Sequence, residues 1–125
     1  MPFLVIVEFY FLDFPSEAKF LGQPYEPRAG TVFELPATEL RVGRRLENDL
    51  VLPCHNVSSF HLRLFPEGDH YVYEDIGSRQ IPLYNGKPML SDSHHRVMKD
   101  GDTFNAAGVV FRYLESIPTD LVVEG

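Results

Sequence analysis

The sequence has 125 residues, a net charge of −7 and 44% hydrophobic residues. This length suits one domain, and the hydrophobic fraction excludes extensive disorder. The acidic balance argues against a general binder of nucleic acid or of anionic membranes. The single cysteine, Cys54, excludes an internal disulfide and fits a reducing, cytoplasmic compartment.

The chain begins with a long hydrophobic run over residues 3–12. It lacks a basic start and a small-residue cleavage site, and it carries Glu8, so it predicts a buried strand and not a signal peptide. The run is also too short for a membrane span, and no membrane insertion is expected. The segment 15–22 is the one helix candidate, at most a short helical turn near residues 16–21, and a proline-rich loop follows.

The remaining hydrophobic runs are short, rich in β-branched and aromatic residues, and separated by turn signals. Strands are predicted over residues 31–35, 39–43, 50–52, 60–65, 70–75, 81–85, 96–98, 102–106 and 109–115. Turns are predicted at PEGD (66–69), YNGK (84–87) and KDGD (99–102). In the run 60–65, Phe60, Leu62 and Leu64 are predicted to face one way, and His61 and Arg63 the other.

Many short strands joined by tight turns predict an all-β fold, an antiparallel β-sandwich of about eleven strands. We expect a single domain over residues 1–115, with residues 116–125 as a tail or linker. Its oligomeric state cannot be predicted from these patterns.

Charge is distributed unevenly along the chain. Residues 1–40 hold six acids and two bases, residues 100–125 hold five acids and one base, and residues 41–99 hold seven acids and eight bases. The middle is therefore the one stretch that does not repel an anionic ligand.

Three loops in this middle stretch carry hydrogen-bond donors, and a sandwich gathers its loops at its ends. Arg44 offers a planar, permanently charged fork that suits phosphate oxygens. Ser58 and Ser59 offer hydroxyl groups, and Arg79 and Gln80 offer a second cation and an amide. Together these side chains predict a site for a compact dianion.

The ordered series of motifs resembles a forkhead-associated (FHA) domain, the phosphothreonine-peptide module. The matching residues are Gly43-Arg44, Asn48-Asp49-Leu50 with Leu52, Ser58-x-x-His61, Asp75-Ile-Gly-Ser78, Asn85-Gly86, Asp100-Gly101-Asp102 and the closing VVFRY. The resemblance covers residues 42–113, roughly three-fifths of the chain. It implies an FHA-like sandwich that binds a phosphothreonine-containing protein or peptide in kinase signalling or assembly, without catalysis and without a cofactor.

The resemblance also implies roles for individual residues. Arg44, Ser58 and Ser59 would contact the phosphate, with Arg79 as an added cation where the family commonly has Thr or Ser. Gln80 would take the place of an Asn that holds the peptide backbone. Loop-structural roles would fall to Gly43, His61, Asp75, Ser78, Asn85 and Gly86.

The loop after Ser78 departs from the family's usual Ser-Thr-Asn-Gly-Thr, because it reads Arg79-Gln80-Ile81-Pro82. Gln is one methylene longer than Asn, so its amide reaches a different point. Ile81 stands in place of a glycine, and a β-branched residue disfavours positive φ, so the loop must take another path. The departure affects the expected contact with the peptide backbone and leaves the phosphate contact in place.

Other readings of these residues stay open. Arg44 in isolation would read as a solvated turn residue, and Ser58 could merely cap its own turn. The five histidines have no zinc-finger or helical spacing, so no metal site is predicted, and Cys54-His55 is not a convincing nucleophile pair. The alternative function is a degenerate FHA scaffold that mediates phosphate-independent docking or assembly.

Overall fold

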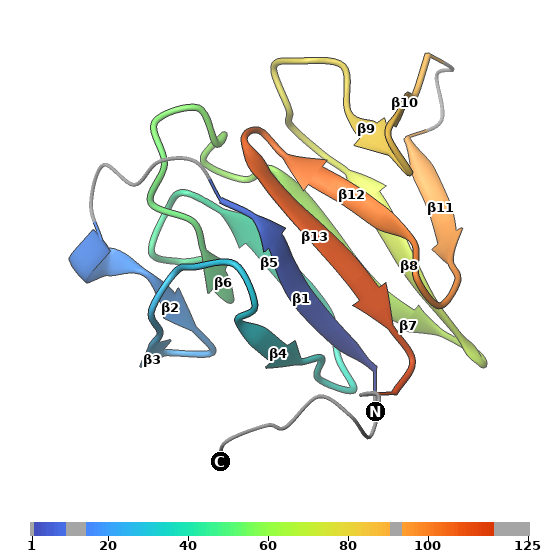
Figure 1. The fold of residues 1–125 in the computed structure, drawn as a ribbon, viewed down its shortest axis with the longest axis horizontal. Coiled ribbons are helices and arrows are strands. Elements are labelled where there is room, and N and C mark those ends of the chain that lie inside the picture. The colour runs from blue at the N-terminus through green and yellow to red at the C-terminus, as the bar shows by residue number, and fades with distance from the viewer. Residues whose placement is uncertain (1, 10–14, 91–93, 117–125) are drawn as a thin grey trace.

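A computed structural model of the chain describes residues 2–9, 15–90 and 94–116. Thirteen strands and one 3-10 turn in this part form two sheets that face each other (Figure 1). The predicted all-β sandwich is confirmed, with thirteen strands in place of about eleven. The described part of the chain holds no helix of the length and hydrophobicity that crossing a membrane would need.

The first sheet has six strands, and every neighbouring pair in it is antiparallel. In spatial order they are β10 (Lys87–Pro88), β9 (Leu83–Tyr84), β12 (Thr103–Ala106), β13 (Val109–Leu114), β1 (Phe3–Glu8) and β4 (Val32–Glu34). The strands at the two ends of the described chain, β1 and β13, are therefore hydrogen-bonded neighbours.

The second sheet has seven strands. In spatial order they are β11 (His95–Met98), β8 (His70–Asp75), β7 (Leu62–Glu67), β5 (Leu40–Gly43), β6 (Leu50–Val51), β2 (Lys19–Phe20) and β3 (Gln23–Pro24). The pair β5–β6 is parallel, in contrast to the fully antiparallel prediction, because the chain returns after residues 44–49 to run beside β5 in the same direction. The other neighbouring pairs are antiparallel.

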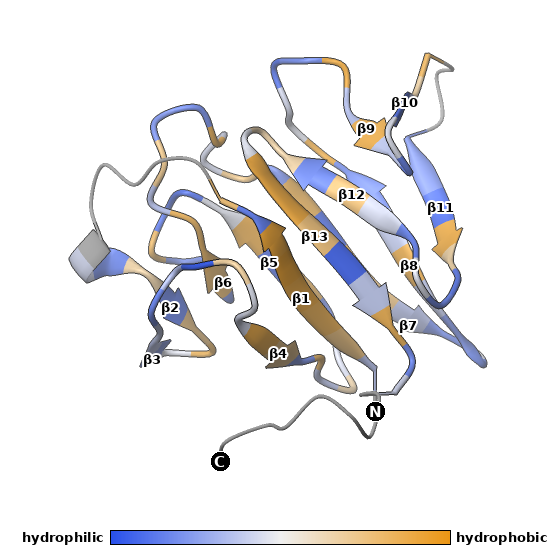
Figure 2. Ribbon diagram, viewed as in Figure 1, coloured by the Kyte–Doolittle hydropathy of each residue, from blue (hydrophilic) through white to orange (hydrophobic). Residues whose placement is uncertain are grey.

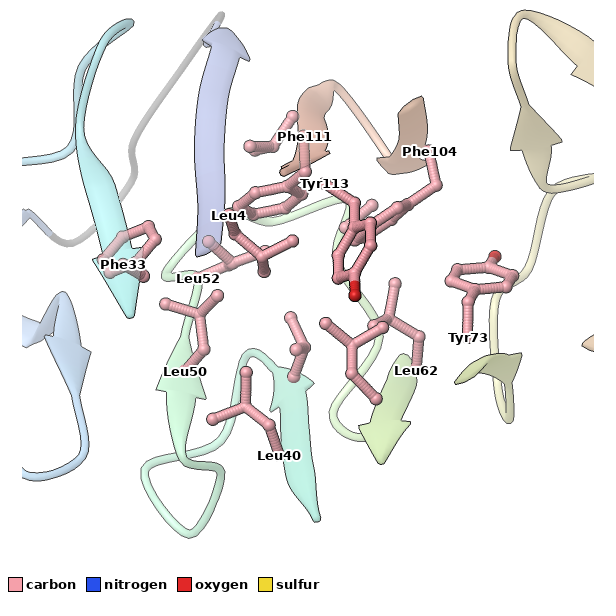
Figure 3. Close-up of a cluster of buried hydrophobic side chains, with 14 of the residues drawn as sticks. Leu4, Phe33, Leu40, Leu50, Leu52, Leu62, Tyr73, Phe104, Phe111 and Tyr113 are labelled. Carbon is pink, nitrogen blue, oxygen red and sulfur yellow. The ribbon is translucent and has the colours of Figure 1, made fainter. Parts of the chain in front are cut away.

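The core lies between the two sheets, and alternation along the strands builds it. In β13, Val109, Phe111 and Tyr113 are buried and Arg112 is exposed, as the period of two predicts. Labelled side chains from both sheets point toward one another in Figure 3, and the rings of Phe104 and Phe111 stack 5.5 Å apart. Figure 2 shows hydrophobic residues concentrated along β1, β4 and β13. Burying each such side chain contributes about 1.5–3 kcal/mol.

The predicted helical turn is confirmed only at its start, because the 3-10 turn covers Pro15–Glu17 and β2 follows at Lys19. The wider helix candidate over 15–22 is wrong. Leu21 and Gly22 adopt positive φ values of 48° and 81°, which closes a tight hairpin between β2 and β3. Pairing of β2 with β6 outweighs the propensity of a helix this short, which is marginal in water.

Several strand boundaries also differ from prediction, and the strand predicted over 81–85 shortens to Leu83–Tyr84. The described part of the first strand ends at Glu8, and residues 10–12 of its expected range lie outside the described residues, as do residues 117–125 of the expected tail. Strand β7 begins at Leu62 and not at residue 60, so Phe60 is 40% exposed and does not join the core. The turn predicted at 66–69 is shorter in the structure. Glu67 and His70 pair as the last residues of the two strands, so only residues 68–69 form the turn.

Candidate functional site at the loop end

The loops that carry the predicted site residues lie at one end of the sandwich, in the upper part of Figure 1. This loop end consists of residues 44–49, 52–61 and 76–82, together with the β12–β13 turn at residues 107–108. The segments that the sequence separates are thus brought to a common end by the strand order of the two sheets.

Backbone hydrogen bonds hold the loop of residues 44–49, which we call the arginine loop, beside the loop of residues 52–61, which we call the serine loop. The amide of Arg44 donates to the carbonyl of Ser58 at 3.0 Å, and the amide of Arg45 donates to the carbonyl of Ser59 at 3.3 Å. The main chains of Arg44 and Ser58 are therefore adjacent, while the meeting of their side chains at one anion stays a prediction.

A close approach at Gly43 makes this pairing possible. A Cβ atom at residue 43 would lie 2.3 Å from the carbonyl oxygen of Ser59 and 2.7 Å from the side-chain nitrogen Nδ2 of Asn48. The Asn48 side-chain amide donates to the carbonyls of Ser59 at 2.7 Å and Arg45 at 2.9 Å, so it bridges the two loops. Gly43 thus lies at the contact between the two loops, and Asn48, whose side chain bridges them, is not among the predicted site residues.

His61 fixes the serine loop from below. Its Nδ1 accepts a hydrogen bond from the Ser58 amide at 3.0 Å, which places the ring proton on Nε2 and leaves the imidazole neutral. Burial lowers the pKa of His61, opposed by the nearby Asp75 carboxylate. The carbonyl of His61 also accepts from the amides of Ile76 and Gly77, both at 3.1 Å, so this one residue joins two of the loops.

Gly77 is a second residue that the predicted site missed. A Cβ there would lie 2.4 Å from the carbonyl oxygen of Phe60. Both residues lie within the matched motifs, but no role was predicted for them, because the contact that needs each residue comes from a loop eleven or more positions away in the chain.

The cations of the loop end differ in how their charge is neutralised. Arg45 pairs with Glu47 at 2.9 Å and lies 6.0 Å from the centre of the Phe60 ring. Arg44 instead donates from Nη1 to the carbonyl of His55 at 3.2 Å. Within residues 2–9, 15–90 and 94–116, no carboxylate forms an ion pair with Arg44 or Arg79. These two guanidinium groups therefore keep their charge available to an anion.

The side chain of Ser58 is buried, at 8% exposure, and its hydroxyl has no hydrogen-bond partner among the described residues. Four buried side-chain polar atoms in the described part lack a partner, and three of them belong to Asn48, Ser58 and Asp75 at this end. Buried polar atoms are normally paired, so these three atoms have hydrogen-bonding capacity left for a water molecule or a ligand. Ser59, by contrast, is half-buried.

Arg79 and Gln80 line a small pocket of about 50 Å³ together with Asn56 and His61. The exposed Ile81 does not adopt positive φ, as predicted for a β-branched residue, so the loop follows a path of its own. Its turn is closed by the Ser78 hydroxyl, which donates to the carbonyl of Gln80 at 2.9 Å.

Asp75 anchors the start of the same loop, since its Oδ1 accepts from the Ser78 amide at 3.3 Å. Asn85 and Gly86 form the β9–β10 turn with φ values of 54° and 75°. The Asn85 side chain donates to Asp102 at 3.1 Å and accepts from the Thr103 amide at 2.8 Å. Asn85 therefore braces its turn against β12, and no described hydrogen bond links it directly to the arginine loop.

The described residues contain no group of three or more His, Cys, Asp or Glu side chains that could hold a metal ion. What the described loop end offers instead is two arginines without a described carboxylate partner, the hydroxyl of the half-buried Ser59 and the buried hydroxyl of Ser58. Donors of this kind recognise an anion with several acceptor oxygens.

Comparisons with known proteins bear on the family and the fold of the chain. A family model described as the FHA domain matches residues 40–106, which is more than half of the chain. A search of curated protein sequences found no match.

Several solved structures share the fold. The FHA domain of the CT664 protein from Chlamydia trachomatis has a TM-score of 0.68 at 16% identity, over 93% of this chain and 98% of that one. An FHA domain studied for its phosphothreonine-dependent interactions has a TM-score of 0.65 at 18% identity, over 94% and 98%. EmbR from Mycobacterium tuberculosis, solved with a low-affinity phosphopeptide, has a TM-score of 0.64 at 26% identity, over 83% of this chain and 28% of that one.

Proposed function

The chain belongs to the FHA domain family, and from this premise we propose that it is a phosphothreonine-dependent protein-interaction module. It binds a phosphorylated peptide at the loop end of the sandwich and acts by recognition, not by catalysis. Its place of action is the cytoplasm, the reducing compartment that a single unpaired cysteine suits. The proposal is supported by EmbR, a neighbour in fold that was solved with a phosphopeptide.

The observation that carries the proposal is the pairing of the arginine loop with the serine loop, at 3.0 and 3.3 Å between their main chains. It holds the Arg44 guanidinium and the Ser58 and Ser59 hydroxyls on adjoining segments. A phosphothreonine carries about −1.5 to −2 charges and three acceptor oxygens, whereas Asp or Glu carries a single charge. Several donors on a fixed frame therefore distinguish the phosphate group from a carboxylate.

Binding requires two small local changes. Arg44 must exchange its bond to the His55 carbonyl for bonds to phosphate oxygens, and Ser58 must turn its covered hydroxyl toward the ligand. The first exchange replaces a neutral acceptor by a charged one, and charge-assisted hydrogen bonds are about twice as strong as neutral ones. The second gives a partner to a buried hydroxyl that has none among the described residues.

Peptide residues next to the phosphothreonine would be recognised by the loop of residues 79–82, whose sequence departs from the family pattern. Arg79 is exposed and has no carboxylate partner among the described residues, and Gln80 presents an amide beside the small pocket. We expect a preference for an acidic residue C-terminal to the phosphothreonine, attracted by Arg79. An oriented phosphopeptide library tests this expectation, and a library without acidic enrichment at those positions would reject it.

The decisive experiment is a titration of the protein with four peptides that differ at one position: phosphothreonine, phosphoserine, threonine and aspartate. We expect the phosphothreonine peptide to bind tightest. The phosphoserine peptide should lose about 1 kcal/mol for the missing methyl group, and the other two should bind weakly or not at all. Equal binding of the threonine and phosphothreonine peptides would contradict the proposal.

A second candidate is the degenerate scaffold, in which the same sandwich docks partners without phosphate. The burial of the Ser58 hydroxyl and the Ile81-Pro82 departure favour it. Treatment of partner proteins with phosphatase separates the two functions, because it should abolish binding to a phosphothreonine module and leave binding to a scaffold unchanged.

A further inference from the structure

A groove of about 390 Å³ lies at the end of the sandwich opposite the loop end. It is formed where the β7–β8 hairpin, the end of β13, the start of β1 and the segment after β4 meet, in the lower right of Figure 1. No sequence motif marks it, because its walls come from four separate parts of the chain. We call it the proline–tyrosine groove, after Pro2, Pro36, Pro66, Tyr71 and Tyr113.

The floor of the groove is held rigidly. The rings of Tyr71 and Tyr113 stack with 6.3 Å between their centres and 29° between their planes, and each residue is 4% exposed. The Tyr71 hydroxyl donates to the carbonyls of Pro36 at 2.8 Å and Thr38 at 3.3 Å. Proline has a fixed φ and no amide donor, so the walls present apolar surface and need little ordering when a ligand binds.

The rim of the groove is acidic. Asp69 and Glu115 are exposed lining residues, and the Glu115 amide donates to the Asp100 carboxylate at 2.9 Å, which brings a third acid close by. Burial raises the pKa of Tyr113, and the Glu115 and Asp100 carboxylates raise it further. Among the described lining residues there is no Lys or Arg, and His70 is the one that can carry positive charge.

We propose that the proline–tyrosine groove binds an arginine or lysine side chain from a basic, extended segment of a partner protein. The observations that favour this occupant are the apolar proline walls and the carboxylates at the rim. A cation gains from the carboxylates, while its methylene stem covers the apolar surface of the walls. The volume falls within the range of about 300–1,000 Å³ found for ligand pockets and admits one long side chain with part of its backbone.

This site is independent of the phosphothreonine proposal, because none of its lining residues belongs to the loop end. The two ends can be occupied together, so the domain would join a phosphorylated partner to a basic one. The charge contrast between the ends favours the two ligands in opposite places and disfavours exchange between them.

The test is a titration of the isotopically labelled protein, followed by NMR, with the peptide acetyl-Ala-Pro-Arg-Pro-Ala-amide. The matched control peptide replaces arginine by citrulline, which has nearly the same shape and no charge. We expect shifts of the amide signals of Gly68, Tyr71 and Tyr113 with the arginine peptide, and at least tenfold weaker binding of the citrulline peptide. Shifts confined to other residues, or equal binding of the two peptides, would overturn the proposal.

A pair of variants completes the test. The double variant Asp69→Asn with Glu115→Gln should weaken binding of the arginine peptide at least tenfold and leave binding of a phosphothreonine peptide unchanged. Glu26→Gln, an exposed acid outside the groove, should change neither. An unchanged affinity in the double variant, with the thermal midpoint also unchanged, would refute the role of the rim. Tight binding only after removal of residues 117–125 would identify the chain's own tail as the occupant and refute the partner segment.

Discussion

The loop end and the proline–tyrosine groove lie at opposite ends of one sandwich, and they are built in opposite ways. At the loop end, backbone hydrogen bonds and buried polar side chains hold cations in place, and three buried polar atoms lack a partner among the described residues. At the groove, stacked rings and prolines form a rigid apolar surface, and the charges at its rim are acidic. The comparison teaches that strand order supplies the frame, while local polarity decides what each end can recognise.

The largest expected effect comes from removing the central cation of the loop end. Arg44→Ala should weaken binding of a phosphothreonine peptide by about 2–5 kcal/mol, because a desolvated phosphate loses its counter-charge. This corresponds to roughly 30- to 4,000-fold in dissociation constant, measured by calorimetric titration. Folding should change by less than about 0.5 kcal/mol, since Arg44 is not part of the core.

Arg45→Ala is the matched control for Arg44, because it removes a neighbouring arginine whose charge is already paired with Glu47. It should bind the peptide nearly as well as the unmodified protein. If both variants bind alike, Arg44 does not contact the phosphate and the contrast between the two ends loses its main support.

Substitution of Gly43 tests the frame rather than the charge. The Cβ of Gly43→Ala would lie 2.3 Å from the Ser59 carbonyl oxygen, so the two loops must separate. We expect a loss of about 1–3 kcal/mol in the free energy of unfolding, measured by chemical denaturation, as for other overpacked sites.

The control for this substitution is Gly22→Ala, where an added Cβ meets no atom within 4 Å and only the positive φ of 81° is strained. That strain costs about 1–2 kcal/mol and should leave peptide binding unchanged. Full binding by the Gly43 variant would show that the close approach of the loops is dispensable.

Ser58→Ala separates binding from stability at a single atom. Its hydroxyl is buried without a partner among the described residues, so its removal should leave the free energy of unfolding unchanged or raise it. Binding of the phosphothreonine peptide should weaken by about 1–2 kcal/mol, because one phosphate oxygen loses a donor. A variant that binds normally would place the hydroxyl outside the site.

The smallest expected effect is a dependence on pH through His61. Burial holds the pKa of His61 below its ordinary value, and its Nδ1 must remain unprotonated to accept the bond from the Ser58 amide. The unfolded state therefore takes up a proton first as the pH falls, and stability should be full above pH 6.5 and decline below it. His61→Gln should reduce this decline when thermal midpoints are compared between pH 7.5 and 5.5.

The fold could be read from the sequence where local pattern and tertiary environment agree. The alternation of β13 predicts which of its side chains are buried, and Asn85-Gly86 predicts a tight turn that the structure contains. The hairpin of β2 and β3 could not be predicted, because two strands of two residues each depend on pairing with β6. The local sequence favours a short helix there, but pairing with β6 determines the structure that forms.

The residues of the candidate site also differ in whether the sequence could identify their roles. Gly43, Ser58 and His61 could be chosen from an ordered series of motifs, and the structure brings all three together. Asn48 and Gly77 belong to the matched motifs, but their roles were not predicted, because these roles depend on carbonyl groups of a distant loop. The proline–tyrosine groove was missed as well, since residues as far apart as Pro2 and Tyr113 have no shared local pattern.

The pairing of β1 with β13 has a consequence for how the protein is made. Strand β13 lies between β12 and β1, so the six-stranded sheet cannot close until residue 114 has left the ribosome. At about 5–20 residues per second, β1 waits roughly 5–20 s after its own synthesis for β13, although β4 can pair with its other edge earlier. During that interval its apolar face is open to molecular chaperones, so nascent chains stalled before β13 should be the form of this protein most prone to aggregate.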